Sequence, residues 1–182
     1  KLKKYLSKMT PANEVLEKYE VVPGGIANAE QRKAIVDIGA WIGDKTSTAL
    51  NFVLEGRGGT GKTAVVQKII ANAIAQKAIT QAEVLYTATT HTAKVTLAEA
   101  TQQDVMTIWK ALGVRPPDEV DVTSTNNSTE IVDIDNSEND PLNGVKVLII
   151  DEASMIGEAM IAKIKDKTES RGIKILYLGD GA

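Results

Sequence analysis

The octapeptide GRGGTGKT, residues 56–63, has the residue types and spacing of a phosphate-binding loop. Its glycines allow consecutive backbone N–H groups to point at phosphate oxygens, and a following helix adds partial positive charge. Lys62 would reach the β- and γ-phosphates, and the Thr63 hydroxyl would bind Mg²⁺. The backbone around the phosphates would come from Gly58, Gly59, Thr60 and Gly61. A position between a predicted strand and a predicted helix favours this interpretation over the alternative, a glycine turn with a surface lysine.

Two adjacent carboxylates form the second chemical feature. Asp151 and Glu152 follow the apolar run VLII at residues 147–150. Asp151 is placed to bind Mg²⁺ through water, and Glu152 to orient or deprotonate an attacking water. The alternative is structural, because DEASM also resembles the first turn of a helix. Beside a phosphate loop, the pair predicts hydrolysis of a nucleoside triphosphate.

The elements that must position these residues alternate along the chain. Apolar segments at 49–56, 83–88, 145–151 and 173–180 are predicted strands, and three have the nearly continuous hydrophobicity of strands covered on both faces. Helical patterns follow or separate them in GKTAVVQKIIANAIAQ, TAKVTLAEA, DVMTIWKALG and SMIGEAMIAKIKDKT. This alternation predicts an α/β fold, a parallel sheet flanked by helices with right-handed crossovers.

The amino-terminal residues 1–27 are predicted to be a helical accessory segment. Thr10 is a candidate N-cap, Pro11 suits the first helical position, and PGG at 23–25 would end the helix. The main domain is predicted over residues 28–182. It would begin with a helix whose apolar face carries Ala34, Ile35, Ile38, Trp41 and Ile42.

Residues 115–140 interrupt the alternation of strands and helices. They contain eight acidic residues against one basic residue, and this composition favours a disordered surface loop. Two β-prone arms around Asn126 and Asn127 favour a hairpin instead. From the residues alone, both interpretations stay open.

Composition excludes several other kinds of site. The 182 residues, 43% of them hydrophobic, suit one core. The absence of cysteine excludes disulfides and thiolate metal sites, and a single histidine argues against a histidine-rich metal site. No apolar run is long enough for a membrane span, so no membrane partner is expected. A net charge of −3 neither supports nor excludes a DNA partner.

Five segments, in order, resemble successive motifs of superfamily 1 DNA helicases of the Dda/RecD-like branch. They are GRGGTGKT, TATTHTAK (87–94), VMTIWKALG (105–113), LIIDEASM (148–155) and YLGD (177–180). The resemblance covers about residues 26–182 and implies a P-loop NTPase motor domain of the RecA-like kind. It also implies ATP and Mg²⁺ as cofactors, single-stranded DNA as partner, a monomer, and a place in the cytoplasm of a bacterial or phage-infected cell.

The resemblance assigns a nucleotide contact on each side of the phosphate loop. Gln31 matches a glutamine that reads the adenine, although it also stands where a capping-box partner of Asn28 would. Asp180 lies in the Gly-Asp pair of a motif that borders the nucleotide.

The resemblance also assigns single-stranded DNA contacts to Thr90, His91 and Lys94 in one motif and to Thr107 in the next. Thr89 stands where relatives often carry proline. His91 could instead be an ordinary exposed or capping residue. Trp109 stands where relatives carry histidine, and it could stack on a base or belong to the core. In relatives, the place of residues 115–140 holds a β-hairpin that helps to separate the strands.

In relatives, a glutamine and a second RecA-like domain follow the Gly-Asp pair, whereas this sequence stops at Ala182. We therefore expect a truncated chain whose partner is the missing carboxyl-terminal RecA-like domain. That domain contributes an arginine finger. Alone, the chain should bind ATP with little hydrolysis and no unwinding. A P-loop kinase is one alternative, but the four arginines of this sequence form no lid-like cluster. A regulatory nucleotide-binding module is another alternative.

Overall fold

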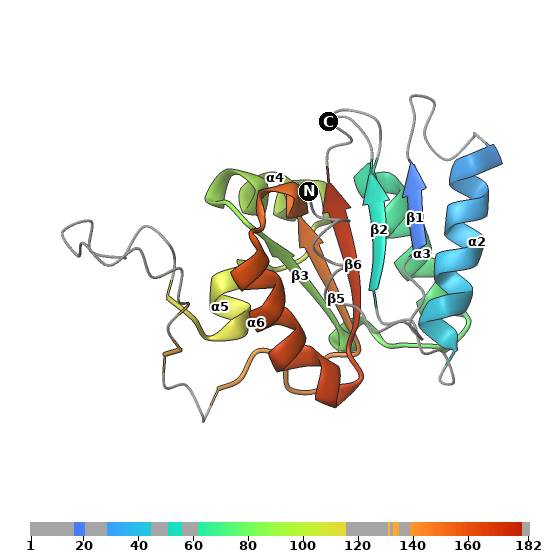
Figure 1. Ribbon diagram of the computed structural model, residues 1–182. Helices are drawn as coiled ribbons and strands as arrows, with labels where there is room; N and C mark the ends of the chain where they lie inside the picture. The colour runs from blue at the N-terminus through green and yellow to red at the C-terminus, as the bar shows by residue number, and fades with distance from the viewer. Residues whose placement is uncertain are drawn as a thin grey trace.

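Six parallel strands form one sheet in the computed structural model, which describes residues 17–20, 29–44, 51–55, 62–115, 131, 133–134 and 139–179. Their order across the sheet is β1-β2-β6-β5-β3-β4 (Figure 1). The strands are β1 (Glu17–Glu20), β2 (Asn51–Glu55), β3 (Val84–Ala88), β4 (Val105–Thr107), β5 (Val147–Asp151) and β6 (Lys174–Gly179). The predicted α/β fold with a parallel sheet is confirmed, and so are its four predicted strands.

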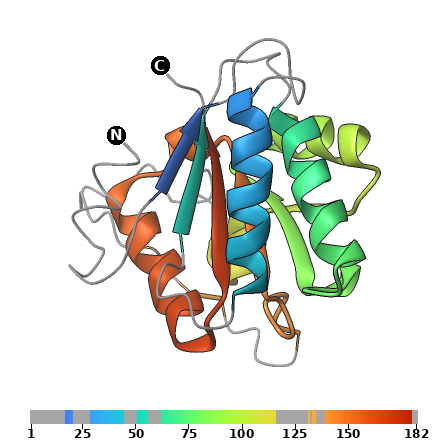
Figure 2. The same cartoon turned by 90° about the vertical axis from the view of Figure 1, so that its right-hand side faces the viewer.

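Helices cover both faces of the sheet (Figures 1 and 2). One face carries α2 (Ala29–Gly43), α3 (Lys62–Ala75) and α4 (His91–Thr101), and the other carries α5 (Ile108–Leu112) and α6 (Glu158–Thr168). Short 3₁₀ turns lie at η2 (Gln81–Glu83), η4 (Ala153–Met155) and η5 (Glu169–Arg171). Among the described helices, none is long and apolar enough to cross a membrane.

Two apolar clusters hold the layers together, and the central strands contribute to both. In β5, Val147 and Ile149 pack under α2, α3 and α4, whereas Leu148 and Ile150 pack under α5 and α6. This alternation explains the continuous hydrophobicity of the segment, because a parallel strand between two helical layers has no solvent face.

The apolar face predicted for α2 is confirmed. Ile35, Ile38, Trp41 and Ile42 are all buried, whereas the side chain of Ala34 lies outside the described residues. The Trp41 ring lies 4.1 Å from that of Phe52 on β2, centroid to centroid.

The prediction of a helix over the amino-terminal segment is wrong for residues 17–20. They form β1, which pairs in parallel with β2, with Tyr19 opposite Leu54. The exposed edge of β2 supplies unpaired backbone groups, and pairing with them outweighs a local helical pattern. The predicted cap at Thr10 and Pro11 lies outside the described residues.

The segment DVMTIWKALG was predicted to be one helix, and the structure divides it. Val105–Thr107 forms the edge strand β4, with Met106 opposite Thr87, and α5 begins only at Ile108. Pairing with β3 extends Val105–Thr107, because a free sheet edge offers these residues backbone partners.

Lys174, the first residue of β6, is a buried cation at the amino edge of the sheet. Its Nζ donates to the carbonyl oxygens of Trp41, of Ile42 at 3.3 Å and of Asp44 at 2.7 Å. These three carbonyls lie at the carboxyl end of α2. Burial lowers the pKa of Lys174, and the Asp44 carboxylate partly offsets this effect. Beside it lies a cavity of about 380 Å³, at the edge opposite to the predicted phosphate loop. Lys174 therefore acts as the C-cap of a helix distant in sequence.

Replacing Tyr177 with phenylalanine should raise the free energy of unfolding by about 1 kcal/mol. Tyr177 is fully buried in the cluster under α6, and its hydroxyl has no hydrogen-bond partner among the described residues. Burial also raises the pKa of this phenol. Urea denaturation measures the change. Tyr86→Phe, on the other face of the sheet, is the control, and an equal or larger gain there would contradict the explanation.

Candidate nucleotide site at the carboxyl edge of the sheet

The parallel strands end at one edge of the sheet, and most of the predicted site residues lie in or follow these ends. In the register, Glu55 at the end of β2 lies opposite Gly179 at the end of β6. Ala88 at the end of β3 lies opposite both Asp151 and Thr107. Open α/β sheets bind ligands at this edge, because the loops and helix N-termini that follow the strands meet there.

The helix predicted to follow the phosphate loop begins at Lys62. The Lys62 ammonium donates to the Gly179 carbonyl at 3.0 Å, a contact between residues 117 positions apart. Thr63 follows in the first turn of α3 and is half-buried. The loop residues Gly58, Gly59, Thr60 and Gly61, like Asp180, lie outside the described residues. Lys62 is thus held beside the ends of β2 and β6.

The two predicted catalytic carboxylates form a sharp turn at the end of β5. Asp151 Oδ1 accepts a hydrogen bond from the Glu152 N–H at 2.8 Å. Glu152 has φ +55°, in the left-handed region that non-glycine residues seldom adopt. Such backbone strain clusters at functional sites. The alternative is met in part: DEASM does begin a helical turn, η4, with Glu152 at its N-cap position, but the Glu152 side chain makes no capping hydrogen bond.

Thr89 directly follows β3 and stands where members of the resembled helicase family often carry proline. It is buried, its N–H donates to the Asp151 carbonyl at 3.3 Å, and its Oγ1 donates to the Glu152 carbonyl at 3.0 Å. Proline has neither donor. Thr89 therefore ties the end of β3 to the backbone carbonyls of Asp151 and Glu152, and the threonine in place of proline was the signal that could have revealed it.

The residues predicted to contact DNA lie at the starts of two helices on the same edge. Thr90 is the N-cap of α4, accepting from the Ala93 N–H at 3.0 Å, and Thr107 is the N-cap of α5, accepting from the Lys110 N–H at 3.3 Å. His91 is exposed in the first turn of α4, and Lys94 is half-exposed. Both threonines thus have a structural role, and each hydroxyl keeps its proton for donation.

The two remaining residues singled out from the sequence are Gln31 and Trp109. Gln31 lies in the first turns of α2, but its side chain and Asn28 are outside the described part of the chain. Trp109 is partly buried against the cluster under α5 and α6, which favours the core interpretation over base stacking.

A family model described as an AAA domain matches residues 27–182. The chain belongs to the AAA domain family. This family is found in P-loop helicases such as the Dda/RecD-like group, so this AAA domain is a nucleotide-binding P-loop NTPase. A comparison with curated proteins found no match.

The donor set of this AAA domain suits magnesium that arrives with a nucleotide. Within the described ranges, no group of three or more His, Cys, Asp or Glu residues could hold a metal ion. Mg²⁺ usually takes one or two protein oxygens together with substrate phosphates and water. The Thr63 hydroxyl and the Asp151 carboxylate are ligands of this kind, so the residues present fit Mg²⁺.

Proposed function

We propose that this AAA domain is the amino-terminal motor domain of an ATP-dependent DNA helicase, binding ATP with Mg²⁺ and single-stranded DNA at the carboxyl edge of its sheet. The observation that supports the proposal is the pair of Thr89 hydrogen bonds to Asp151 and Glu152. Thr89 precedes Thr90 and His91, so one short segment joins the proposed hydrolytic pair to the proposed DNA contacts.

In the proposed nucleotide site, each residue has a separate task. Lys62 neutralises charge on the β- and γ-phosphates, and Thr63 and Asp151 hold the metal. Bound Mg²⁺ would supply charge stabilisation to the phosphates. Glu152 orients the attacking water and accepts its proton, from a left-handed backbone turn directly after β5. Full hydrolysis also needs an arginine finger from a second RecA-like domain.

In the proposed DNA site, Lys94 supplies the positive charge. Lys94 is half-exposed and lies in the first turn of α4, which begins at His91. The helix N-terminus adds partial positive charge, and Thr90 and Thr107 each offer a hydroxyl proton to a phosphate or sugar oxygen. These contacts read the backbone and not the sequence, as a translocating motor requires.

Replacing Lys94 with alanine should weaken single-stranded DNA binding about fivefold and make the slope of log K against log salt shallower by about 0.7, because one phosphate contact is lost. Fluorescence anisotropy with a labelled oligonucleotide, measured at several salt concentrations, gives both values.

Lys68→Ala is the matched control, since Lys68 is an exposed lysine on a different helix, α3, that carries none of the proposed DNA contacts. Equal losses in the two variants would contradict the proposed DNA site. Failure of the wild-type chain to bind single-stranded DNA would contradict the helicase assignment, and phosphorylation of an added nucleotide acceptor would favour a kinase.

A further inference from the structure

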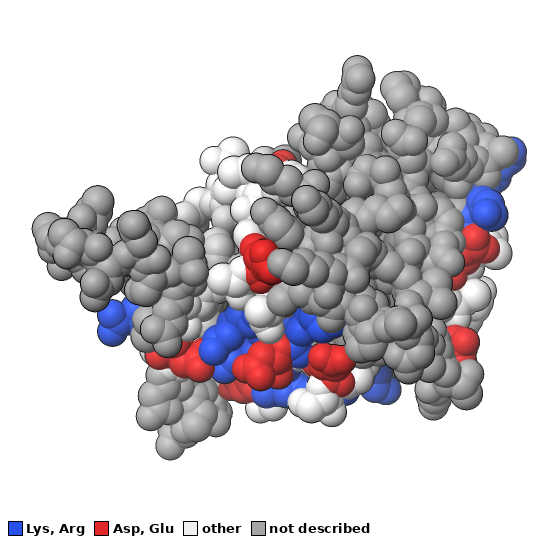
Figure 3. Space-filling model, viewed as in Figure 1, with Lys and Arg blue, Asp and Glu red and all other residues white. Residues whose placement is uncertain are grey.

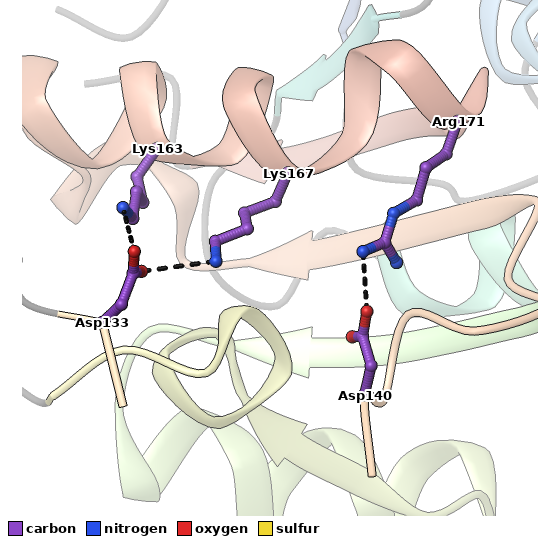
Figure 4. Close-up of polar contacts among 5 residues, drawn as sticks. All are labelled: Asp133, Asp140, Lys163, Lys167 and Arg171. Carbon is purple, nitrogen blue, oxygen red and sulfur yellow. Dashed lines mark hydrogen bonds and ion pairs between the residues drawn. The ribbon is translucent and has the colours of Figure 1, made fainter. Parts of the chain in front are cut away.

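Acidic and basic side chains lie next to one another on the face that carries α6 (Figure 3). The end of the acidic insertion, residues 115–140, contributes two of the carboxylates (Figure 4). Asp133 lies 2.9 Å from the Lys163 Nζ, and Asp140 lies 2.7 Å from a terminal nitrogen of Arg171. These ion pairs attach the end of the insertion to α6 and η5. The carboxylates of the candidate nucleotide site are positioned by a different kind of contact.

The backbone turn at Glu152 links the two residues of the proposed hydrolytic pair, Asp151 and Glu152. Glu152 has φ +55° and ψ +38°, in the left-handed region. A non-glycine residue is strained there, and such a conformation persists only where the surrounding structure determines it. The turn therefore depends on groups that hold the peptide planes on the two sides of Glu152.

Thr89 holds both of these peptide planes. The Asp151 carbonyl belongs to the plane before Glu152 and accepts from the Thr89 N–H at 3.3 Å. The Glu152 carbonyl belongs to the plane after it and accepts from the Thr89 Oγ1 at 3.0 Å. Because peptide planes are rigid, the relative orientation of these two planes is given by the φ and ψ of Glu152. Two hydrogen bonds from one residue thus restrain the left-handed turn.

The plane before Glu152 also orients the Asp151 side chain. The N–H of this plane, which is that of Glu152, donates to Asp151 Oδ1 at 2.8 Å. One carboxylate oxygen is therefore placed relative to a plane that Thr89 holds. Thr89 is itself buried, so water competes little for its hydrogen bonds. The contacts thus run from Thr89 through the backbone to the carboxylate that is proposed to bind Mg²⁺.

We propose that Thr89 is a positioning residue, which maintains the turn at Glu152 and so sets how tightly Asp151 holds the Mg²⁺ that arrives with ATP. The proposal rests on the proposed function, in which Asp151 is a metal ligand. Removing a group that orients a metal ligand typically lowers metal affinity about 10–100-fold. Thr89 acts through the backbone, so we expect an effect near the lower value.

The functional test uses Thr89→Val, which keeps a similar shape and the backbone N–H but removes the hydroxyl donor. ATP is titrated into the full 182-residue chain, once with Mg²⁺ and once with EDTA. The gain in ATP affinity on adding Mg²⁺ should fall about tenfold, while the affinity in EDTA stays within about twofold of the wild type. The two conditions separate the metal from Lys62, which meets the phosphates in both.

The structural test follows the turn without any nucleotide. Hydrogen exchange of the Glu152 amide should become about tenfold faster in Thr89→Val, because the peptide plane that carries this amide is held less firmly. Thr89→Ala removes the same donor without adding an apolar group and should give the same two results. Thr89→Ser keeps the hydroxyl and should restore both values.

Thr87→Val is the matched control for the loss of a buried threonine. Thr87 lies on the same strand, β3, and its Oγ1 donates to the Ile149 carbonyl at 2.7 Å, within the sheet and away from the turn. This variant should keep the gain in ATP affinity from Mg²⁺ and the slow exchange of the Glu152 amide.

An unchanged gain from Mg²⁺ in folded Thr89→Val and Thr89→Ala would overturn the proposal, and so would an equal loss in Thr87→Val. A wild-type chain that bound ATP equally well with and without Mg²⁺ would contradict the metal role. If the wild-type chain bound no ATP at all, the proposed function would fail. Exchange of the Glu152 amide would then still decide whether Thr89 holds the turn.

Discussion

Replacing Lys62 with alanine should lower the affinity of this chain for ATP about 100-fold. A hydrogen bond to a charged group contributes about 1.5–3 kcal/mol, and tenfold in affinity corresponds to about 1.4 kcal/mol. The Lys62 ammonium already lies at the carboxyl edge of the sheet, 3.0 Å from the Gly179 carbonyl. It therefore needs little reorganisation to meet a phosphate. Isothermal titration with ATP and Mg²⁺ measures the change.

The interpretation needs a control for the lost contact to Gly179. Lys68→Ala removes an exposed lysine from the same helix and should bind ATP like the wild type. Urea unfolding of Lys62→Ala should show about 1 kcal/mol of destabilisation, since the partly buried hydrogen bond to Gly179 is lost. A folded Lys62→Ala chain with unchanged affinity would mean that the phosphate-loop assignment is wrong.

Replacing Lys174 with methionine should destabilise the fold by about 3 kcal/mol. Methionine keeps most of the volume of the side chain but donates no hydrogen bond, so the carbonyls of Trp41, Ile42 and Asp44 lose a buried partner. The ammonium also lies 5.5 Å from the centroid of the Trp41 ring, an interaction that methionine loses. Water entering from the adjacent cavity would donate hydrogen bonds to some of these carbonyls and so limit the loss of stability.

Chemical denaturation with urea measures this effect, and Lys68→Met is the matched control. The control makes the same substitution at an exposed helical position and should change stability by less than about 0.5 kcal/mol. Equal stability of Lys174→Met and the wild type would show that Lys174 does not hold the end of α2. ATP affinity should be unchanged in the folded protein, because Lys174 lies at the opposite edge of the sheet.

The central strands could be predicted because their signal is local. β2, β3, β5 and β6 are apolar runs, and a chain segment between two helical layers has no other place to bury such residues. The same holds for α2, whose buried residues recur at helical spacing.

The two edge strands could not be predicted, since neither has a strand pattern of its own. β1 has the sequence EKYE, and β4 has only three residues that continue into the pattern of α5. Both are strands because a neighbouring edge, β2 or β3, offers unpaired backbone groups. That opportunity exists only after the sheet has formed.

By itself, the sequence predicted the class of chemistry, with phosphate binding assigned to GRGGTGKT and hydrolysis to a carboxylate pair after a buried strand, because these motifs depend on residue types at short spacing. Only the tertiary structure decided which residues meet. Lys62 donates to Gly179, Thr89 donates to the backbone of Asp151 and Glu152, and acidic residues of the insertion pair with α6 and η5. The physical reason is that each of these contacts joins segments far apart in the chain, and only the order of the strands and the layers of helices brings such segments together.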